Sequence, residues 1–185
     1  GVGGFSGGNL GLLTGDDGVV LIDDGIEPLA AKVIAAIEDT AGAPADFVIN
    51  THVHGDHVGG NAALHVHGAT IVAHDNIRER MVAANAAEDA LPEITFSSEV
   101  TFHLNGYRAH VIHVQHAHTD GDAIIHFPDA NVIHTGDTMF NGLFPFIDLD
   151  SGGSLDGFIA AQNRMLTMSN AETRIIPGHG PLANR

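Results

Sequence analysis

The chain contains no cysteine among its 185 residues. This absence excludes a disulfide framework, a thiolate metal site and a cysteine nucleophile. Basic residues are also scarce, because seven Lys and Arg stand against 23 Asp and Glu, for a formal net charge of −16, and the single lysine is Lys32. A field of this sign repels phosphate groups, so we expect neither nucleic acid nor an anionic membrane surface as a partner.

Long hydrophobic runs are missing too. No stretch reaches the roughly 18 apolar residues that a membrane-spanning helix needs. The glycine-rich opening, Gly1 to Gly8, lacks the Lys-Ser/Thr of a phosphate loop, and we expect it to be a turn that leads into a strand. The length and the 44% hydrophobic content predict one globular domain over residues 1–185.

Turn signals divide much of the chain into hairpins. The expected strand pairs are Asn9–Leu13 with Val19–Asp23, Glu99–Leu104 with Tyr107–Val114 around Asn105-Gly106, and Ala123–Phe127 with Val132–Thr135. Further strands are expected at Ala45–Asn50, Thr70–Ala73 and Arg174–Ile176.

Helical spacing of apolar residues occurs between these strands. Helices are expected from Pro28 onward, at Asn61–Leu64, at Asn76–Ala87, and after a capping Ser154, where the apolar side is Leu155, Phe158, Ile159, Met165 and Leu166. Hairpins with interposed helices predict an α/β (α+β) fold in which two sheets pack face to face and helices cover the outer faces.

The segment Thr51–Gly60, THVHGDHVGG, is the richest in metal-binding side chains. In an extended segment His52 and His54 point the same way and can hold one ion, whereas Asp56 and His57 follow a turn at Gly55 and can face a second one. Imidazole and carboxylate are the ligands that zinc takes where thiolate is lacking. The alternative, a histidine-rich polar loop, does not explain the carboxylate or Gly59-Gly60.

HxHxDH followed by Gly-Gly resembles the signature of the metallo-β-lactamase superfamily, whose members are αββα sandwich hydrolases with a one- or two-metal site between two mixed sheets. His118-Thr119-Asp120-Gly121-Asp122 resembles the second histidine motif of that family. The resemblance implies that His118 completes the first metal's set of three histidines. His116 is an alternative, but the residues after His118 match the motif better.

Two later segments extend the resemblance. Gly136-Asp137 resembles the motif whose aspartate bridges the metals, although Asp137 could instead cap a turn. Pro177-Gly178-His179-Gly180 resembles the last motif and implies that His179 joins Asp56 and His57 on the second metal. The other nine histidines are assigned no role.

The resemblance implies two zinc ions per chain, with iron or manganese possible. Two such ions lower the pKa of a shared water toward about 7 and polarise the attacked carbonyl, and Asp56 would accept a hydrogen bond from the nucleophile and steer it. No G-x-S-x-G element is present, which argues against a serine hydrolase. The net charge argues against a phosphodiesterase.

A small acyl compound therefore remains as the substrate, with a β-lactam as the first choice over a lactone or a thioester. The position three residues after Asp137 is Phe140, where the cysteine-ligand lactamases have a substrate-binding lysine, and this difference weakens the β-lactamase assignment. The chain ends soon after His179, which weakens the glutathione-thioester assignment. The apolar stretch in Phe140–Gly153 could form a wall of the substrate pocket or a tucked-in loop.

Two other classes stay open: an iron-dependent oxygen or redox enzyme, and a metal-binding protein without turnover. Similar bacterial proteins often carry secretion signals, so we expect the periplasm or secretion rather than the cytoplasm. Oligomeric state cannot be deduced from these patterns.

Overall fold

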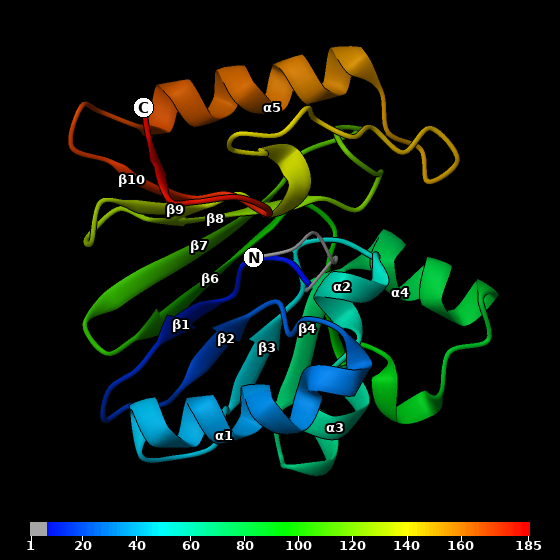
Figure 1. Cartoon of the computed structure of the whole chain (residues 1–185), viewed down its shortest axis with the longest axis vertical. Coiled ribbons are helices and arrows are strands. Elements are labelled where there is room, and N and C mark those ends of the chain that lie inside the picture. Colours follow the sequence, from blue (N-terminus) through cyan, green and yellow to red (C-terminus); the bar gives the residue numbers. More distant parts are fainter. Residues whose placement is uncertain (1–6) are drawn as a thin grey trace.

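The structure, a computed structural model, describes residues 7–185, so most of the turn expected at Gly1–Gly8 lies outside the described residues. Two β-sheets lie face to face in the middle of the molecule, and helices cover their outer sides (Figure 1). The predicted αββα sandwich is confirmed.

The first sheet has the strand order β1-β2-β3-β4-β5. β1 pairs antiparallel with β2 as the predicted hairpin, and the remaining neighbours are parallel, so the sheet is mixed. Its strands are β1 (Gly11–Leu13), β2 (Val20–Ile22), β3 (Phe47–Ile49), β4 (Thr70–His74) and β5 (Ile94–Phe96).

The second sheet has the order β11-β10-β9-β8-β7-β6. Its β9–β10 pair is parallel and the other pairs are antiparallel. The strands are β6 (Glu99–Leu104), β7 (Tyr107–His113), β8 (Ala123–Phe127), β9 (Val132–His134), β10 (Arg174–Ile176) and β11 (Ala183–Asn184).

Successive strand residues point to opposite faces, and in the central strands both faces are largely buried. In β2, Val20 and Ile22 enter the core between the sheets, while Leu21 packs toward the helices of the first sheet. In β8, Ile125 enters the same central core and Ile124 packs beneath the last helix. This explains why the central strands consist almost entirely of apolar residues rather than alternating with polar ones.

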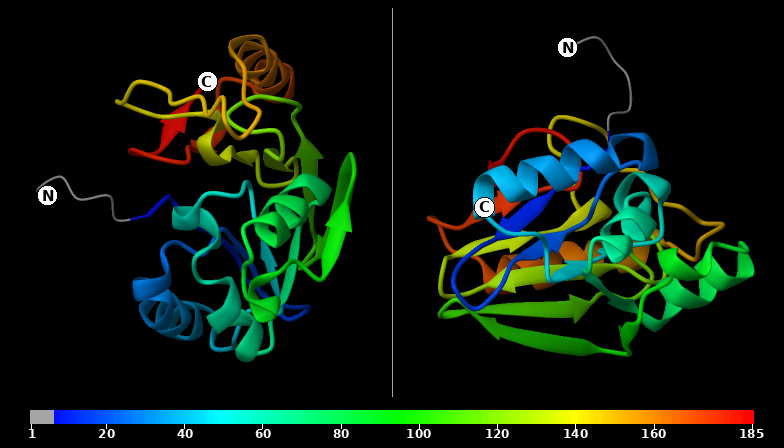
Figure 2. Two further views of the ribbon diagram at one scale, coloured as in Figure 1. Left: turned by 90° about the vertical axis from the view of Figure 1, so that its right-hand side faces the viewer. Right: turned by 90° about the horizontal axis from the view of Figure 1, so that it is seen from below.

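Helices cover the outer face of each sheet, as a second viewing direction also shows (Figure 2). Ile37 of α1 and Leu64 of α3 pack on the first sheet, and Ala161 and Met165 of α5 pack on the second. Among residues 7–185, no helix combines the length and the apolar character that a membrane span requires. The α-helices are α1 (Ala30–Ala41), α2 (Gly55–Val58), α3 (Asn61–Val66), α4 (Asp75–Ala83) and α5 (Leu155–Met168), with 3-10 turns η1 (Glu27–Leu29), η2 (Glu88–Ala90) and η3 (Gly136–Thr138).

The buried side of α5 differs from the expected one. The structure buries Phe158, Ala161 and Met165, which recur at intervals of three and four residues. Leu155, Ile159 and Leu166 are 63%, 49% and 49% exposed, so their assignment to the apolar side was wrong. Ser154 does cap the helix, because its hydroxyl accepts the Gly157 N–H at 3.0 Å.

Candidate metal centre

The candidate ligands come from four segments that follow strand ends. His52 and His54 follow β3, and Asp56 and His57 lie in α2, a four-residue helix in place of the predicted turn. His118 lies between β7 and β8. Asp137 and His179 each come three residues after the end of a strand, β9 and β10, and these two strands are parallel neighbours. Carboxyl ends of parallel strands meet at one sheet edge, where sites commonly form.

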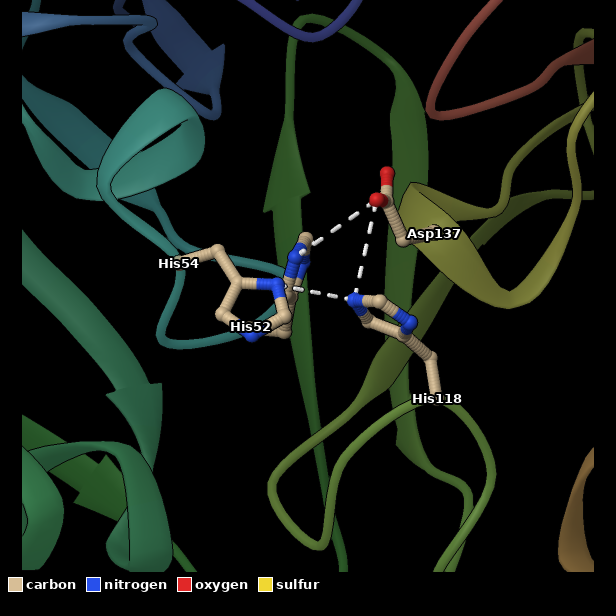
Figure 3. Close-up of side chains that lie close together, drawn as sticks. All are labelled: His52, His54, His118 and Asp137. Atoms are coloured by element: carbon tan, nitrogen blue, oxygen red, sulfur yellow. Dashed lines mark hydrogen bonds and ion pairs between the residues drawn. The ribbon is translucent and has the colours of Figure 1, made fainter. Parts of the chain in front are cut away.

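One group consists of His52, His54, His118 and Asp137, whose potential ligand atoms all lie within 4.8 Å of one another. Figure 3 shows the four side chains pointing toward a common centre from three separate segments. Nε2 of His118 is 2.9 Å from Nδ1 of His54 and 3.6 Å from Oδ2 of Asp137. Nε2 of His52 lies 3.9 Å from the same carboxylate oxygen.

A second group consists of Asp56, His57 and His179, again within 4.8 Å. Oδ2 of Asp56 is 3.2 Å from Nε2 of His179 and 3.6 Å from Nε2 of His57. The structure thus brings together the three histidines expected at the first metal and the three residues expected at the second, and it groups Asp137 with the first set.

Asp137 lies between the two groups. Its Oδ1 is 3.1 Å from Nε2 of His57, and its Oδ2 is 3.3 Å from Nε2 of His179, while Oδ2 also faces the first group. This is the position that a bridging carboxylate needs. Gly178 and Gly136 permit the approach: a Cβ on Gly178 would collide with Oδ1 of Asp137, and Gly136 has a φ of +49° with Thr51 Oγ1 2.5 Å from the place of its Cβ.

The protons of two histidines can be placed from their outer partners. Thr51 Oγ1 donates its only proton to Asp23 Oδ2 at 2.8 Å, so it must accept from Nδ1 of His52 at 3.1 Å. Nδ1 of His57 donates to the same Asp23 oxygen at 2.8 Å. In the neutral rings, therefore, Nε2 of His52 and Nε2 of His57 carry no proton, and both face the cluster.

The same reasoning applies to the other two histidines of the first group. Nδ1 of His118 lies 2.8 Å from the backbone carbonyl of Phe146, and Nε2 of His54 lies 2.8 Å from Asp148 Oδ2. Both outer partners are acceptors, so these nitrogens carry the protons. Nδ1 of His54 and Nε2 of His118 are then two lone pairs 2.9 Å apart, an arrangement that a shared cation stabilises.

The residues present fit a pair of metal ions. Nε2 of His52 is a buried atom without a hydrogen-bond partner in residues 7–185. Nε2 of His57 and Oδ1 of Asp137 are buried 3.1 Å from each other, and with a neutral His57 ring both present lone pairs. Leaving such groups unpaired costs about 1–3 kcal/mol each, a cost that coordination removes. The donors are imidazoles and carboxylates, which suit zinc, iron or manganese. Calcium, in contrast, prefers a set of oxygen ligands.

Charge in the cluster is strongly coupled. Burial would raise the pKa of Asp137, but His179, His57 and His52 around it hold that pKa well below its usual range. Burial lowers the pKa of His52, and the neighbouring His57 lowers it further. Hydrogen bonds to Asp137 and Asp56 raise the pKa of His179 to about 9. Positive charge at the centre, from protons or from metal ions, therefore stabilises the ionised carboxylates.

Asp23 is a functional residue that the sequence reasoning missed. It is fully buried, and besides Thr51 Oγ1 and His57 it binds the Thr51 N–H through Oδ1 at 2.7 Å. Its φ of +57° is unusual for a residue other than glycine, which is typical of positions fixed by a site. Its place directly after the apolar strand β2 was the available signal.

His116 does not join either group. Its Nδ1 lies 2.9 Å from the Gly152 carbonyl, so the choice of His118 over His116 agrees with the geometry. His74 and His113 stack on each other outside the cluster with ring centroids 3.7 Å apart. Burial lowers the pKa of His113, and His74 beside it adds to this.

Aromatic rings border the cluster. Phe140 stacks on His179 with 5.5 Å between ring centroids, and the ring of Phe146 lies 5.7 Å from that of His118. Phe146 and the nearby Phe144 are 56% and 97% exposed. The loop is thus not tucked in, and its exposed aromatic side chains are available to a substrate.

Curated relatives are similar in sequence to part of the chain. A hydroxyacylglutathione hydrolase of Brucella anthropi is 34% identical over 137 residues, which are 71% of this chain and 47% of that protein. A hydroxyacylglutathione hydrolase of Polaromonas sp. is 27% identical over 162 residues, 86% of this chain and 57% of that protein. The chain spans about half the length of the curated relatives it matches.

Solved structures share the fold over nearly the whole chain. A metallo-beta-lactamase from Pontibacter korlensis superposes with a TM-score of 0.81 over 94% of this chain and 80% of that one, at 21% identity. TTHA1623 in a di-iron-bound form superposes with a TM-score of 0.71 over 96% and 89%, at 28% identity. The family model "Metallo-beta-lactamase superfamily" matches residues 3–179, and this chain therefore belongs to that superfamily.

Proposed function

We propose that this protein is a dinuclear metal-dependent hydrolase that cleaves an acyl bond of a small molecule. The observation that carries the proposal is the set of outer hydrogen-bond partners around the cluster. One ring nitrogen each of His52, His54, His57 and His118 contacts such a partner, so in the neutral ring the other nitrogen faces the centre with a lone pair. Asp137 lies within reach of both groups, as one carboxylate shared by two ions requires.

The first group would hold one ion and the second group the other, with Asp137 shared. When bound, two such ions lower the pKa of water toward about 7 and polarise a carbonyl oxygen. Asp56 supplies the accessible carboxylate of the cluster, since its side chain is 21% exposed and that of Asp137 only 6%. Oδ2 of Asp56 lies 3.2 Å from Nε2 of His179, and this carboxylate would accept a hydrogen bond from the attacking water.

The first substrate class we propose is a thioester. Several curated relatives are named hydroxyacylglutathione hydrolase, and an acyl group on the sulfur of glutathione is a thioester. These names move the first choice away from a β-lactam, for which the likeness to lactamase structures supplies only the fold. The aromatic side chains of Phe140 and Phe146 favour an apolar part next to the scissile bond.

Metal analysis and a substrate panel test this proposal together. We expect about two zinc ions per chain in protein purified without added metal, and hydrolysis of S-acylglutathione thioesters that chelation abolishes and zinc restores. A chromogenic cephalosporin and a set of lactones belong in the same panel, and preferential turnover of either would reassign the substrate. Iron with visible absorption and no hydrolysis would favour a redox enzyme. Bound metal without any turnover would favour a binding protein.

A further inference from the structure

The loop between η3 and α5, residues 139–154, returns to two histidines of the first group. The Phe146 carbonyl accepts a hydrogen bond from Nδ1 of His118 at 2.8 Å, and Oδ2 of Asp148 accepts one from Nε2 of His54 at 2.8 Å. The Asp148 N–H also donates to the His118 carbonyl at 2.9 Å. One short segment therefore holds both rings from outside the cluster.

Asp148 is also held in place by contacts other than the one to His54. Its Oδ1 accepts the N–H groups of Asp150 and Ser151, both at 3.1 Å, and its carbonyl accepts the Gly153 N–H at 2.8 Å. Burial opposes ionisation, but Ser151 and His54 hold the pKa of Asp148 well below its usual range. The carboxylate is an acceptor only, and its two oxygens serve three N–H donors.

We propose that Asp148 is a positioning residue that fixes the tautomer and the ring orientation of His54 for metal binding. Because Oδ2 can only accept, Nε2 of His54 must carry the proton. Nδ1 is then the lone pair that faces Nε2 of His118 at 2.9 Å. Outer partners of this kind typically change metal affinity about 10–100-fold when they are removed. The inference rests on the proposed function in that the cluster binds metal.

An Asp148→Asn substitution separates this role from simple packing. An amide has one oxygen where the carboxylate has two, and the two backbone N–H groups of Asp150 and Ser151 compete for it. With the oxygen on those donors, the NH₂ group faces Nε2 of His54 and donates to it. The proton of His54 must then move to Nδ1, the atom that the metal needs.

Two measurements test the proposal. Long-range ¹H–¹⁵N NMR of the metal-free protein should show His54 protonated at Nε2 in the natural protein and at Nδ1 in Asp148→Asn. Competition with a chromogenic chelator should show a loss of about 10–100-fold in zinc affinity in that variant. Asp150→Asn is the matched control, since its side chain is exposed and the contact to Asp148 uses its backbone N–H; it should leave both readouts unchanged.

His118 serves as an internal monitor of the loop. Its Nδ1 proton, held by the Phe146 carbonyl, should stay in place in Asp148→Asn. A changed tautomer at both histidines would show that the loop as a whole, rather than Asp148, positions the rings, and would overturn the assignment. An unchanged His54 tautomer or an unchanged zinc affinity would overturn it as well. If the natural protein bound no zinc at all, the proposed function would fail, whereas the tautomer measurement would still decide the role of Asp148.

Discussion

A metal site of this kind depends on which ring nitrogen of each histidine carries no proton. The hydrogen-bond partner of the other ring nitrogen, which lies outside the cluster, determines this. Asp23 fixes His57 directly and His52 through Thr51. The Phe146 carbonyl fixes His118. The nitrogens left to hold an ion would be Nε2 of His52, His57 and His118 and Nδ1 of His54, so a substitution of an outer partner would change metal binding without removing a ligand.

Asp56 is the residue whose loss should separate chemistry from metal binding. In Asp56→Asn the amide oxygen can still face the second ion, but the side chain no longer accepts a proton from water. We expect the variant to keep most of its metal and to lose at least about 100-fold in kcat. Steady-state kinetics with parallel metal analysis measure both quantities. Asp39→Asn on the exposed face of α1 is the control, and full activity in Asp56→Asn would show that its role is misassigned.

At this scale the sequence indicated the residues that the structure brings together, but not their outer partners. His52, His54, Asp56 and His57 share one short segment, and the resemblance to the family's later motifs indicated His118, Asp137 and His179. Asp148 lies 94 residues from His54 in the chain, and Asp23 lies 34 residues from His57. No local pattern records contacts of that range, because the Asp148 contact depends on how the two sheets meet and the Asp23 contact on the pairing of β2 with β3.

At the scale of elements, a sequence pattern predicts the strands that have a specific turn or a continuous apolar run. The hairpin around Asn105-Gly106 was predicted because its strands are long and its turn is specific. β5 and β11 were missed, because Ile94-Thr95-Phe96 and Ala183-Asn184 lack the continuous apolar run that marked the other short strands. The face of α5 was assigned wrongly because small Ala161, not a large apolar residue, continues its buried stripe. Leu155 and Ile159 were chosen for their hydrophobicity alone.

Ser154 links α5 to the loop that carries His116. Its hydroxyl accepts the Gly157 N–H at 3.0 Å and donates to the His116 carbonyl at 2.8 Å. Ser154→Ala should therefore lower the free energy of unfolding by about 1 kcal/mol, which is roughly 2–4 °C in Tm for a chain of this size. Calorimetry measures the shift. Ser169→Ala at the other end of α5, where the hydroxyl makes only a 3.4 Å contact, should change Tm far less; equal shifts would contradict the capping role.

The whole molecule is two sheets joined by an apolar core, and the candidate metal centre joins them a second time. His52, His54, Asp56 and His57 follow a strand of the first sheet, whereas His118, Asp137 and His179 come from segments of the second. The fold class could be predicted because each sheet has its own run of strands along the chain. The meeting of the two halves at one site could be inferred only through the family's motifs.

Ions bound at this centre would connect both sheets, so their removal should destabilise the entire fold. A ligand that binds only the folded state at 100 times its Kd contributes about 2.7 kcal/mol, or roughly 5–11 °C in Tm at this chain length. We expect chelation at neutral pH to lower Tm by about this amount, measured by calorimetry alongside metal analysis. Added zinc should restore Tm, and magnesium should not, since it prefers oxygen ligands and the cluster is rich in imidazole. An unchanged Tm in protein shown to be metal-free would mean that the core alone holds the two sheets together.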